Sequence, residues 1–265
     1  MANETDGLEI RSDGPLRWIV IDRDERGNSL TTEMRNAIID ALASANSDRE
    51  VRAVVITAKG KRFCTGADIS GGKKAEDRVA GDAREMIRSG AQRLFRAVWE
   101  CDKPVIAGLN GTAAGLGAHL ALSCDLVVAA ESAKLIEVFA RRGLVPDGGG
   151  AYLLTRLVGP HKAKELFFFA DDVPAAEAER IGLVNKVVPD DSFEDTLREW
   201  AERLAAGPTR SFAFTKKLVN SALDVGLDAS LDAEASFVEI NTTTADSREG
   251  IMSFVERRDP KFEGR

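Results

Sequence analysis

The 265-residue sequence is poor in histidine and cysteine and holds no long apolar run. Its two histidines, His119 and His161, form no HExxH motif, so no metal site is expected and carboxylates are expected to carry acid–base chemistry. No apolar run reaches the ~18 residues that a membrane helix needs. The chain also lacks a basic tail, which argues against nucleic acid as its main partner.

The three cysteines, Cys64, Cys101 and Cys124, are an odd number and form no CxxC pair. That pattern is typical of reduced thiols in the cytosol rather than of a disulfide framework. Residues 1–13 are polar and acidic and do not resemble a signal peptide. We therefore expect a cytoplasmic protein.

The composition is typical of a soluble globular protein. Apolar residues make up 44% and charged residues 30% of the chain, and 36 Lys and Arg against 43 Asp and Glu leave a net charge of -7. At roughly 150 residues per domain, the length predicts one large domain or two small ones.

Apolar runs and glycine-rich turns alternate along the first half of the sequence. Apolar, β-branched runs predict strands at 16–21, 51–58, 103–109, 125–130 and 184–188. Helices are predicted from the N-cap Thr31 to Ser47, over 82–100, and over a short segment that ends near Ser123. The repetition of strand, glycine turn and helix predicts an α/β fold of repeated ββα units.

Beyond residue 148 the pattern becomes mostly helical. Helices are predicted at about 149–158, 160–169, 174–181, 193–206, 208–223, 227–243 and 246–257. We expect an α/β core over residues 1–195 and a helical C-terminal region over residues 196–265.

The first segment that could carry chemistry is FCTGADI, residues 63–69. A strand ends there in a turn whose glycine permits an unusual backbone angle, and the freed N–H groups could face a ligand. An ordinary strand-to-loop turn is the alternative. Cys64 is interpreted as a small buried side chain and not as a nucleophile, because no base stands at a telling spacing.

The second segment is NGTAAGLGAH, residues 110–119, a run of small residues that leads into a helix. Small side chains let a backbone approach a ligand closely, and the first N–H groups of a helix have no partner within it. Such groups suit a developing oxyanion, although tight helix packing explains the run as well. The run is not a GxGxxG dinucleotide fingerprint, because the third glycine is missing.

The third segment is RGLVPDGGG, residues 142–150, in which glycines follow Asp147 and open a helix. Asp147 could simply cap that helix, since Asp is a common N-cap residue. The spacing alone leaves both a capping role and a chemical role open.

In this order and spacing, the three segments resemble the crotonase superfamily, that is, the enoyl-CoA hydratase/isomerase family. The resemblance runs from Asn28-Ser29-Leu30 to SFVERRDPKFEG at residues 253–264. It implies a crotonase-like spiral of ββα units with a helical C-terminal extension. It also implies that the substrate is an acyl-CoA thioester held in an oxyanion hole, with no cofactor beyond the substrate's own coenzyme A.

By position, the resemblance implies that the backbone N–H groups of Ala67 and Leu116 hold the thioester oxygen. The PDG pattern at Asp147 is similar to family members that shift a double bond with one carboxylate, such as the ring-epoxyphenylacetyl-CoA isomerases. An apolar lining of Phe139, Leu144 and Val145 would raise the pKa of Asp147. The residues implied to contact substrate are Lys61, Arg62, Phe63, Gly66, Asp68, Ile69, Gly115, His119, Phe139 and Lys261.

The sequence departs from the two-glutamate hydratases at both glutamate positions, which hold His119 and Phe139. Glu137 lies two residues from the second position, which on a helix is a different face. We therefore do not expect a two-glutamate mechanism. His119 is interpreted as a packing or supporting polar residue that could also contact substrate.

Local positive charge is expected to bind the phosphates of coenzyme A, from Lys59, Lys61 and Arg62 before the first turn and from Lys261, which could serve a neighbouring subunit. For any one of these residues, an ordinary solvated surface side chain is the alternative. The segment 70–88 is expected to shape the acyl site. The resemblance further implies a homotrimer or a dimer of trimers, with the C-terminal helices between subunits. Enoyl-CoA hydratase and a non-catalytic acyl-CoA binder stay as alternatives.

Overall fold

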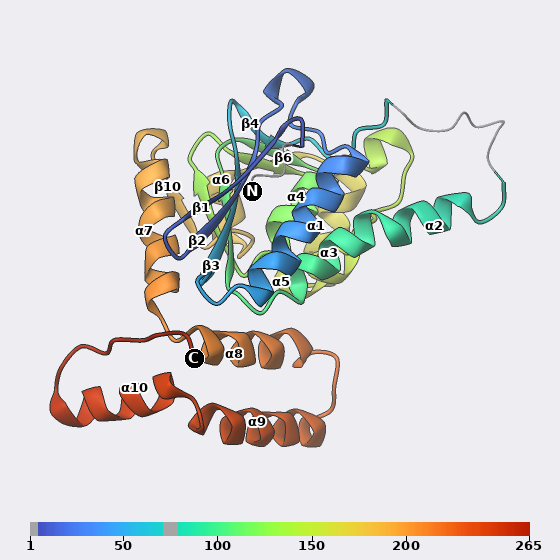
Figure 1. The fold of residues 1–265 in the computed structure, drawn as a ribbon. Coiled ribbons are helices and arrows are strands. Elements are labelled where there is room, and N and C mark those ends of the chain that lie inside the picture. The colour runs from blue at the N-terminus through green and yellow to red at the C-terminus, as the bar shows by residue number, and fades with distance from the viewer. Residues whose placement is uncertain (1–4, 71–78) are drawn as a thin grey trace.

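A six-stranded sheet forms the centre of the fold, in the strand order β1-β2-β3-β5-β7-β10 (Figure 1). The strands are β1 Leu8–Asp13, β2 Leu16–Ile21, β3 Ala53–Ala58, β5 Val105–Leu109, β7 Leu126–Ala130 and β10 Lys186–Val188. β1 and β2 form an antiparallel hairpin, and all other neighbours are parallel. The computed structural model describes residues 5–70 and 79–265.

A second, four-stranded sheet has the order β4-β6-β8-β9 and is parallel except for its last pair. Its strands are β4 Arg62–Cys64, β6 Thr112–Ala114, β8 Lys134–Ile136 and β9 Asp172–Pro174. Three times along the chain a long central strand is followed by one short strand of this second sheet and then by helix: β3-β4, β5-β6 and β7-β8. The predicted α/β fold of repeated ββα units is confirmed.

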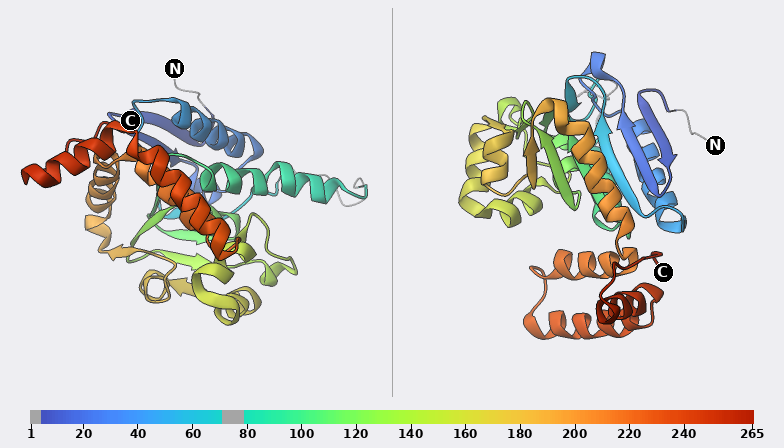
Figure 2. Two further views of the ribbon diagram at one scale, coloured as in Figure 1. Left: turned by 90° about the horizontal axis from the view of Figure 1, so that it is seen from below. Right: turned by 90° about the vertical axis from the view of Figure 1, so that its left-hand side faces the viewer.

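Helices cover both faces of the central sheet (Figures 1 and 2). The helices of the described residues are α1 Thr32–Ser47, α2 Asp82–Ser89, α3 Ala91–Trp99, α4 Leu116–Leu122, α5 Gly150–Phe169, α6 Ala175–Arg180, α7 Phe193–Ala206, α8 Thr209–Ser221, α9 Leu227–Thr242 and α10 Ala245–Glu256, with short 3₁₀ turns at Asp24–Arg26, Ala140–Arg142 and Asp190–Ser192. Thr31 caps α1 as predicted, because its side chain accepts a hydrogen bond from the Met34 N–H. Within the described ranges no helix has the length and apolar character of a membrane span.

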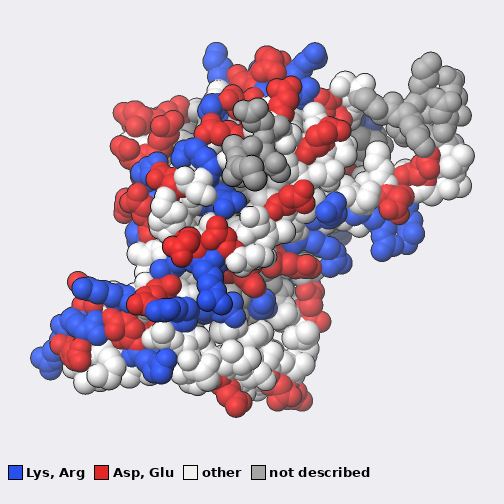
Figure 3. Space-filling model, in the orientation of Figure 1, with Lys and Arg blue, Asp and Glu red and all other residues white. Residues whose placement is uncertain are grey.

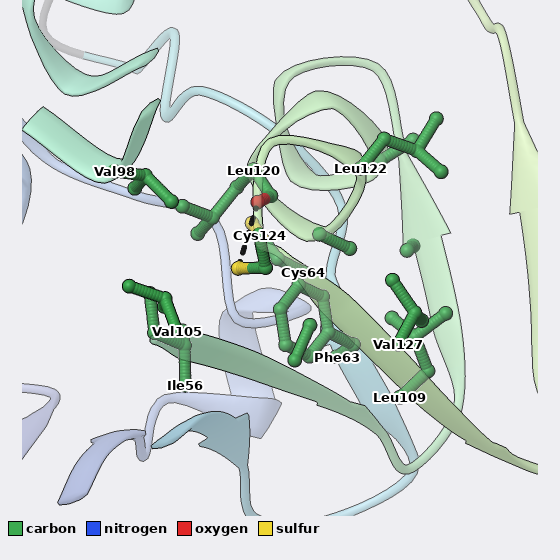
Figure 4. Packing of buried hydrophobic residues seen from close by; sticks show 14 of the residues in the cluster. Ile56, Phe63, Cys64, Val98, Val105, Leu109, Leu120, Leu122, Cys124 and Val127 are labelled. Atoms are coloured by element: carbon green, nitrogen blue, oxygen red, sulfur yellow. Dashed lines mark hydrogen bonds between the residues drawn. The ribbon is translucent and has the colours of Figure 1, made fainter. Parts of the chain in front are cut away.

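The apolar core consists of two clusters, one on each face of the sheet. The larger cluster joins the sheet to α1, α3 and α4, and Figure 4 shows part of it around Phe63 and Cys64. The smaller cluster joins the other face to α7 through Phe193, Leu197 and Ala201. The expected domain boundary between residues 195 and 196 therefore falls inside a helix that packs on the central sheet.

Helices α8, α9 and α10 lie apart from the sheets, below the body of the molecule in Figure 1 and in the right-hand view of Figure 2. These three helices and the turn between α8 and α9 expose many large apolar side chains: Val219, Leu223, Val225, Leu227, Leu231, Val238, Ile240, Ile251, Met252, Phe254 and Val255. A single chain leaves this surface uncovered.

The structure differs from the predicted elements in two places. The helix predicted over 82–100 is broken at Gly90, which separates α2 from α3 and leaves no room for a side chain, since an added Cβ would lie 2.7 Å from the Met86 carbonyl oxygen. Strand β1, Leu8–Asp13, was not predicted at all. The segment 70–88 was expected to shape the acyl site, and its residues 71–78 lie outside the described residues.

Candidate functional site

The first turn, after β4, places the Ala67 N–H group so that it faces away from the neighbouring chain segment. Leu30 forms a parallel bridge with Ala67, in which the Leu30 N–H donates to the Gly66 carbonyl and the Asp68 N–H donates to the Leu30 carbonyl, both at 2.9 Å. In such a bridge the middle residue's own N–H points to the other side. Gly66 makes the turn possible, because its φ is 111°, which few L-residues adopt.

The second turn, between β6 and α4, places Leu116 as the first residue of a helix. Its N–H group therefore has no partner in the preceding turn of helix. Gly115 has a φ of 52° and supplies the sharp reversal that joins the strand to the helix. In residues 5–70 and 79–265, no backbone acceptor is seen for the N–H of Ala67 or of Leu116.

Glycines bring the two turns together backbone to backbone. A Cβ added to Gly117 would lie 2.1 Å from the Cys64 carbonyl oxygen, and one added to Gly66 would lie 3.7 Å from the Leu116 nitrogen. The 2.1 Å separation means that only glycine allows this approach at position 117. The structure thus brings together two segments that are about fifty residues apart in sequence, as expected for a pair of donors that share one oxygen.

Asp147 lies beside these turns, in the loop before α5. An added Cβ at the adjacent Gly148 would lie 2.9 Å from Leu116 Cδ1, which places this loop against the start of α4. Asp147 is half-buried, and its Oδ1 atom is buried without a hydrogen-bond partner in the described structure. Burial raises the pKa of Asp147, while the nearby His119 and Arg35 oppose that rise.

The capping interpretation of Asp147 is wrong. The N-cap of α5 is Gly149, and no side chain caps this helix. The Asp147 carbonyl oxygen, not its carboxylate, accepts the hydrogen bond from the Gly150 N–H at 3.0 Å. The carboxylate is therefore available for another role.

A buried pair of polar side chains, His119 and Glu137, lies next to Asp147. His119 Nε2 is 2.9 Å from Glu137 Oε2, and the two residues are 1% and 5% exposed. The His119 ring stacks on Phe139, with the ring centroids 5.2 Å apart and the planes 13° from parallel. The placement of Glu137 on a helix is wrong, because Glu137 directly follows strand β8 and its carboxylate faces His119.

Arg35, on α1, is a charged neighbour that the sequence did not single out. It interacts electrostatically with Asp147, and burial lowers its pKa. Its position on α1 follows an ordinary amphipathic helix pattern, so only the packing of α1 against the rest of the fold reveals the contact.

The expected apolar lining is divided between buried and exposed residues. Phe139 is buried against His119, whereas Leu144 is 59% and Val145 is 83% exposed in the single chain. Ile69 is likewise exposed, at 78%. Three large apolar side chains near the site are thus open to a ligand or to a neighbouring subunit.

Two residues of the first segment are occupied by contacts within the protein. Phe63 is fully buried in the core, so its side chain has no surface for a substrate (Figure 4). Asp68 accepts hydrogen bonds from the N–H and hydroxyl of Ser70, and from Arg23 Nη1 at 2.6 Å. Those bonds hold the pKa of Asp68 well below its usual range and pin the turn that carries Ala67.

Cys64 fits the small buried side chain that was expected. Burial raises the pKa of its thiol to about 12, which leaves very little thiolate at neutral pH. It packs in the core behind the first turn (Figure 4).

The candidate phosphate ligands differ in their surroundings. Lys59 pairs with Asp22 at 2.8 Å and with Glu9 at 3.0 Å, and Arg62 donates to the Asp24 carbonyl at 2.9 Å. The exposed Lys61 side chain has no ion-pair partner in the described part of the chain. Both signs of charge are mixed over the face seen in Figure 3, so the net charge of -7 forms no continuous acidic surface there.

Lys261 follows α10, and its backbone N–H donates to Glu249 on that helix at 2.8 Å. Helix α10 lies in the lower part of the molecule in Figure 1, whereas β4, β6 and α4 lie in its upper part. A single chain therefore does not bring Lys261 to the two turns. Among the described residues, no group of three His, Cys, Asp or Glu side chains is placed to hold a metal ion.

Comparisons with known proteins agree with this geometry. A family model described as enoyl-CoA hydratase/isomerase matches residues 14–265. A protein of Rhodobacter capsulatus named probable enoyl-CoA hydratase is 41% identical over 94% of this chain and 95% of its own length. The 1,2-epoxyphenylacetyl-CoA isomerase of Escherichia coli is 35% identical over 93% of this chain and 94% of its own length. The crystal structure of an enoyl-CoA hydratase/isomerase from Cupriavidus metallidurans superposes with a TM-score of 0.93 and 30% sequence identity. The superposition covers 99% of this chain and 98% of that one.

The chain therefore belongs to the enoyl-CoA hydratase/isomerase family and has the crotonase fold. It is an enzyme of the hydratase or isomerase type, in a family that acts on acyl-CoA thioesters. A non-catalytic binder is accordingly set aside.

Proposed function

We propose that this enzyme shifts a carbon–carbon double bond in an enoyl-CoA thioester, with Asp147 as the one carboxylate that moves the proton. The observation that carries the proposal is the buried, unpartnered Oδ1 of Asp147 beside two turns whose N–H groups are free. The similarity to a 1,2-epoxyphenylacetyl-CoA isomerase supports the same choice.

In this mechanism the thioester oxygen lies between the N–H groups of Ala67 and Leu116. Asp147 removes a proton from the carbon at one end of the allylic system, and electrons move toward the thioester to give an enolate. The two N–H groups stabilise the negative oxygen, and the loss of one such donor typically costs about 3 kcal/mol. Asp147 then returns the proton to the carbon at the other end, so that substrate and product are isomers.

Burial makes Asp147 a stronger base than a carboxylate in water. An ordinary Asp with a pKa of about 3.9 is a weak base at neutral pH. Desolvation raises the pKa of Asp147, and His119 and Arg35 keep that rise limited. The carboxylate can then be ionised at neutral pH and still accept a proton efficiently.

Hydration of a 2-enoyl-CoA is the second candidate reaction. Glu137 is buried close enough to Asp147 to raise its pKa, so the site holds two carboxylates and not one. Relatives named as hydratases support this alternative.

One assay separates the two candidates. The purified enzyme is given a 3-enoyl-CoA and a 2-enoyl-CoA in separate reactions, and double-bond migration and 3-hydroxyacyl-CoA formation are followed by chromatography. We expect migration of the double bond in the first reaction. Rapid hydration with no migration would overturn the isomerase proposal.

We also propose that α8, α9 and α10 form contacts between subunits in a trimer or a dimer of trimers. Their exposed apolar side chains support this, since large apolar patches on a monomer mark interaction surfaces. Light scattering on the full chain tests it, and a monomer at micromolar concentration would contradict it. In such an assembly Lys261 could reach the site of a neighbouring subunit.

A cytoplasmic location stays a proposal as well. Cys64, Cys101 and Cys124 are all free and buried, which is compatible with a reducing compartment.

A further inference from the structure

Three consecutive glycines follow Asp147 and join it to helix α5. Gly148 and Gly149 have φ angles of 53° and 83°, and α5 begins at Gly150. Glycine restricts a backbone less than any other residue does, so this loop offers little restraint of its own on the Asp147 carboxylate. The position of the carboxylate therefore depends on what the loop and the start of α5 pack against.

The loop rests on an aromatic ring. A Cβ added to Gly149 would lie 2.8, 2.9 and 3.0 Å from the Cδ2, Cγ and Cε2 atoms of Phe95, so the loop backbone lies directly on that ring. The Phe95 ring stacks on Trp99 of the same helix, α3, with the centroids 5.5 Å apart. Tyr152 of α5 meets both rings edge-on, with centroid distances of 6.2 and 5.8 Å. This aromatic trio joins the Asp147 loop, α3 and the first turn of α5.

Tyr152 connects the aromatic trio to the C-terminal helices. Its hydroxyl donates a hydrogen bond to Asp224 Oδ2, which lies 72 positions further along the chain, in the turn between α8 and α9. The other carboxylate oxygen of Asp224 accepts a hydrogen bond from Arg156 Nη2. The Arg156 guanidinium also lies over the Tyr152 ring, 3.5 Å from its centroid. One carboxylate therefore holds two side chains of the first two turns of α5.

Helix α8 fixes the place of the turn that carries Asp224. Lys216 Nζ donates to the Val98 carbonyl, and Asn220 Nδ2 donates to the Trp99 carbonyl, both at 3.1 Å. Both carbonyls belong to the last turn of α3, where the regular helical donors are missing and side chains can take their place. The Asp224 turn is thus tied to the end of the helix that supplies two rings of the trio.

We propose that Asp224 is a positioning residue for Asp147, acting through the hydroxyl of Tyr152 and the aromatic trio on which the Asp147 loop rests. This inference rests on the proposed function of Asp147 as the group that moves the proton. Asp224 should contribute little to the stability of the fold, because its side chain is 42% exposed and exposed ion pairs are weak. Its effect should therefore appear in the reaction rate.

Two variants each remove the contact. Asp224→Ala removes the acceptor, and Tyr152→Phe removes only the hydroxyl and leaves the ring in the trio. Because a small displacement of a catalytic group lowers the rate of the chemical step, we expect each variant to isomerise a 3-enoyl-CoA with a kcat about tenfold below the wild type and a KM within about twofold. Asp228→Ala is the matched control, at an exposed position in the first turn of α9, and should keep the wild-type rate.

The two variants should share one effect. The double variant Asp224→Ala/Tyr152→Phe should be no slower than either single variant, because both changes remove the same contact. Losses that multiply to ~100-fold in the double variant would overturn the inference, since independent effects combine in that way. A wild-type kcat in either single variant would overturn it too, and so would a raised KM with an unchanged kcat.

The acid side of the pH profile gives a readout that a merely structural role would not move. Burial raises the pKa of Asp147, and Glu137 supports that rise. His119 and Arg35 oppose it. When the start of α5 is released in Asp224→Ala, water should reach the carboxylate more easily, so the acid limb of kcat/KM should move to lower pH. An acid limb that stays at the wild-type pH would overturn the inference.

Tyr152 is the only tyrosine of the chain, so the contact can also be measured in the unaltered protein. Burial and the hydrogen bond to Asp224 raise the pKa of its phenol, although Arg156 opposes that rise. In ultraviolet spectra across an alkaline pH series, the midpoint should lie above the ordinary tyrosine value of about 10 and should fall in Asp224→Ala. Equal midpoints in the two proteins would overturn the inference, even if Tyr152→Phe did not fold.

The failure of this inference differs from the failure of the proposed function. Wild-type isomerisation by Asp224→Ala, in an enzyme whose Asp147→Asn variant is inactive, would overturn the inference alone. A wild-type enzyme that does not isomerise a 3-enoyl-CoA, or an Asp147→Asn variant with full activity, would overturn the proposed function and with it the premise of the inference.

Discussion

His119 Nε2 and Glu137 Oε2 lie 2.9 Å apart in the interior of the protein, although the two residues are 18 positions apart in sequence. The pairing of two short strands creates this contact. Ala114 on β6 pairs with Ile136 on β8, and the Gly115 N–H donates to the Ile136 carbonyl. The residue that follows Ile136 is therefore placed beside the helix that follows Gly115.

Removal of Glu137 is expected to destabilise the fold. In Glu137→Ala, the buried Nε2 of His119 loses its hydrogen-bond partner, which should lower the free energy of unfolding by about 1–3 kcal/mol. Urea denaturation of both proteins measures the difference. The control is Glu131→Ala, at an exposed position six residues earlier, which should stay within about 0.5 kcal/mol of the wild type. Equal stability of the two variants would contradict a buried hydrogen bond.

Gly117→Ala should force the two donor turns apart. The new Cβ would lie 2.1 Å from the Cys64 carbonyl oxygen, a distance that no packed structure tolerates without movement. We expect a loss of at least about 2 kcal/mol in stability and a loss of activity in whatever protein still folds. Gly226→Ala is the control, because no atom lies within 4 Å of its added Cβ and its φ is -74°. A fully active Gly117→Ala enzyme would show that the turns do not act together.

The strands and helices with strong patterns could be predicted from the sequence. The apolar run Leu16–Ile21 forms a strand with the predicted bounds, and α1 begins after Thr31 and ends at Ser47 as expected. The break at Gly90 was missed because the helical spacing of apolar residues continues from α2 to α3. A single glycine does not interrupt that spacing. Strand β1 was missed because four of its six residues are polar, on a strand at the edge of the sheet.

The site could be predicted only in part, because some of its residues carry no local sequence pattern. The glycine-rich turns and Asp147 can be recognised from their composition and from their order along the chain. Glu137 and Arg35 do not, because each looks like an ordinary charged residue until the fold places it against His119 or Asp147. A local pattern cannot encode a contact that depends on the register of two three-residue strands.

The raised pKa of Asp147 predicts the acid side of the pH profile. Isomerisation needs the carboxylate form, so kcat/KM should fall as the pH drops through the pKa of Asp147 in the free enzyme. Burial places that pKa above the ordinary Asp value of about 3.9, even though His119 and Arg35 oppose the rise and Glu137 supports it. Initial rates across a pH series measure the midpoint. An acid limb at or below the ordinary value would contradict the prediction.

Asp147→Asn should stabilise the protein at neutral pH. The folded-state pKa of Asp147 lies above the unfolded value, so the proton is bound more tightly in the folded state. The resulting stability is fully present below the unfolded pKa and is lost as the pH rises through the folded pKa. Asparagine avoids that loss, so its Tm should exceed the wild-type Tm at neutral pH, and the difference should shrink in acid. Asp171→Asn, at an exposed position, is the control and should show no such trend.

The activity of Asp147→Asn shows most directly whether Asp147 moves the proton. Asparagine keeps the size and hydrogen-bonding shape of the side chain but cannot accept a proton from carbon. With a 3-enoyl-CoA substrate, we expect a kcat for isomerisation at least ~100-fold below that of the wild type, with little change in KM. Full isomerase activity in the folded variant would contradict it.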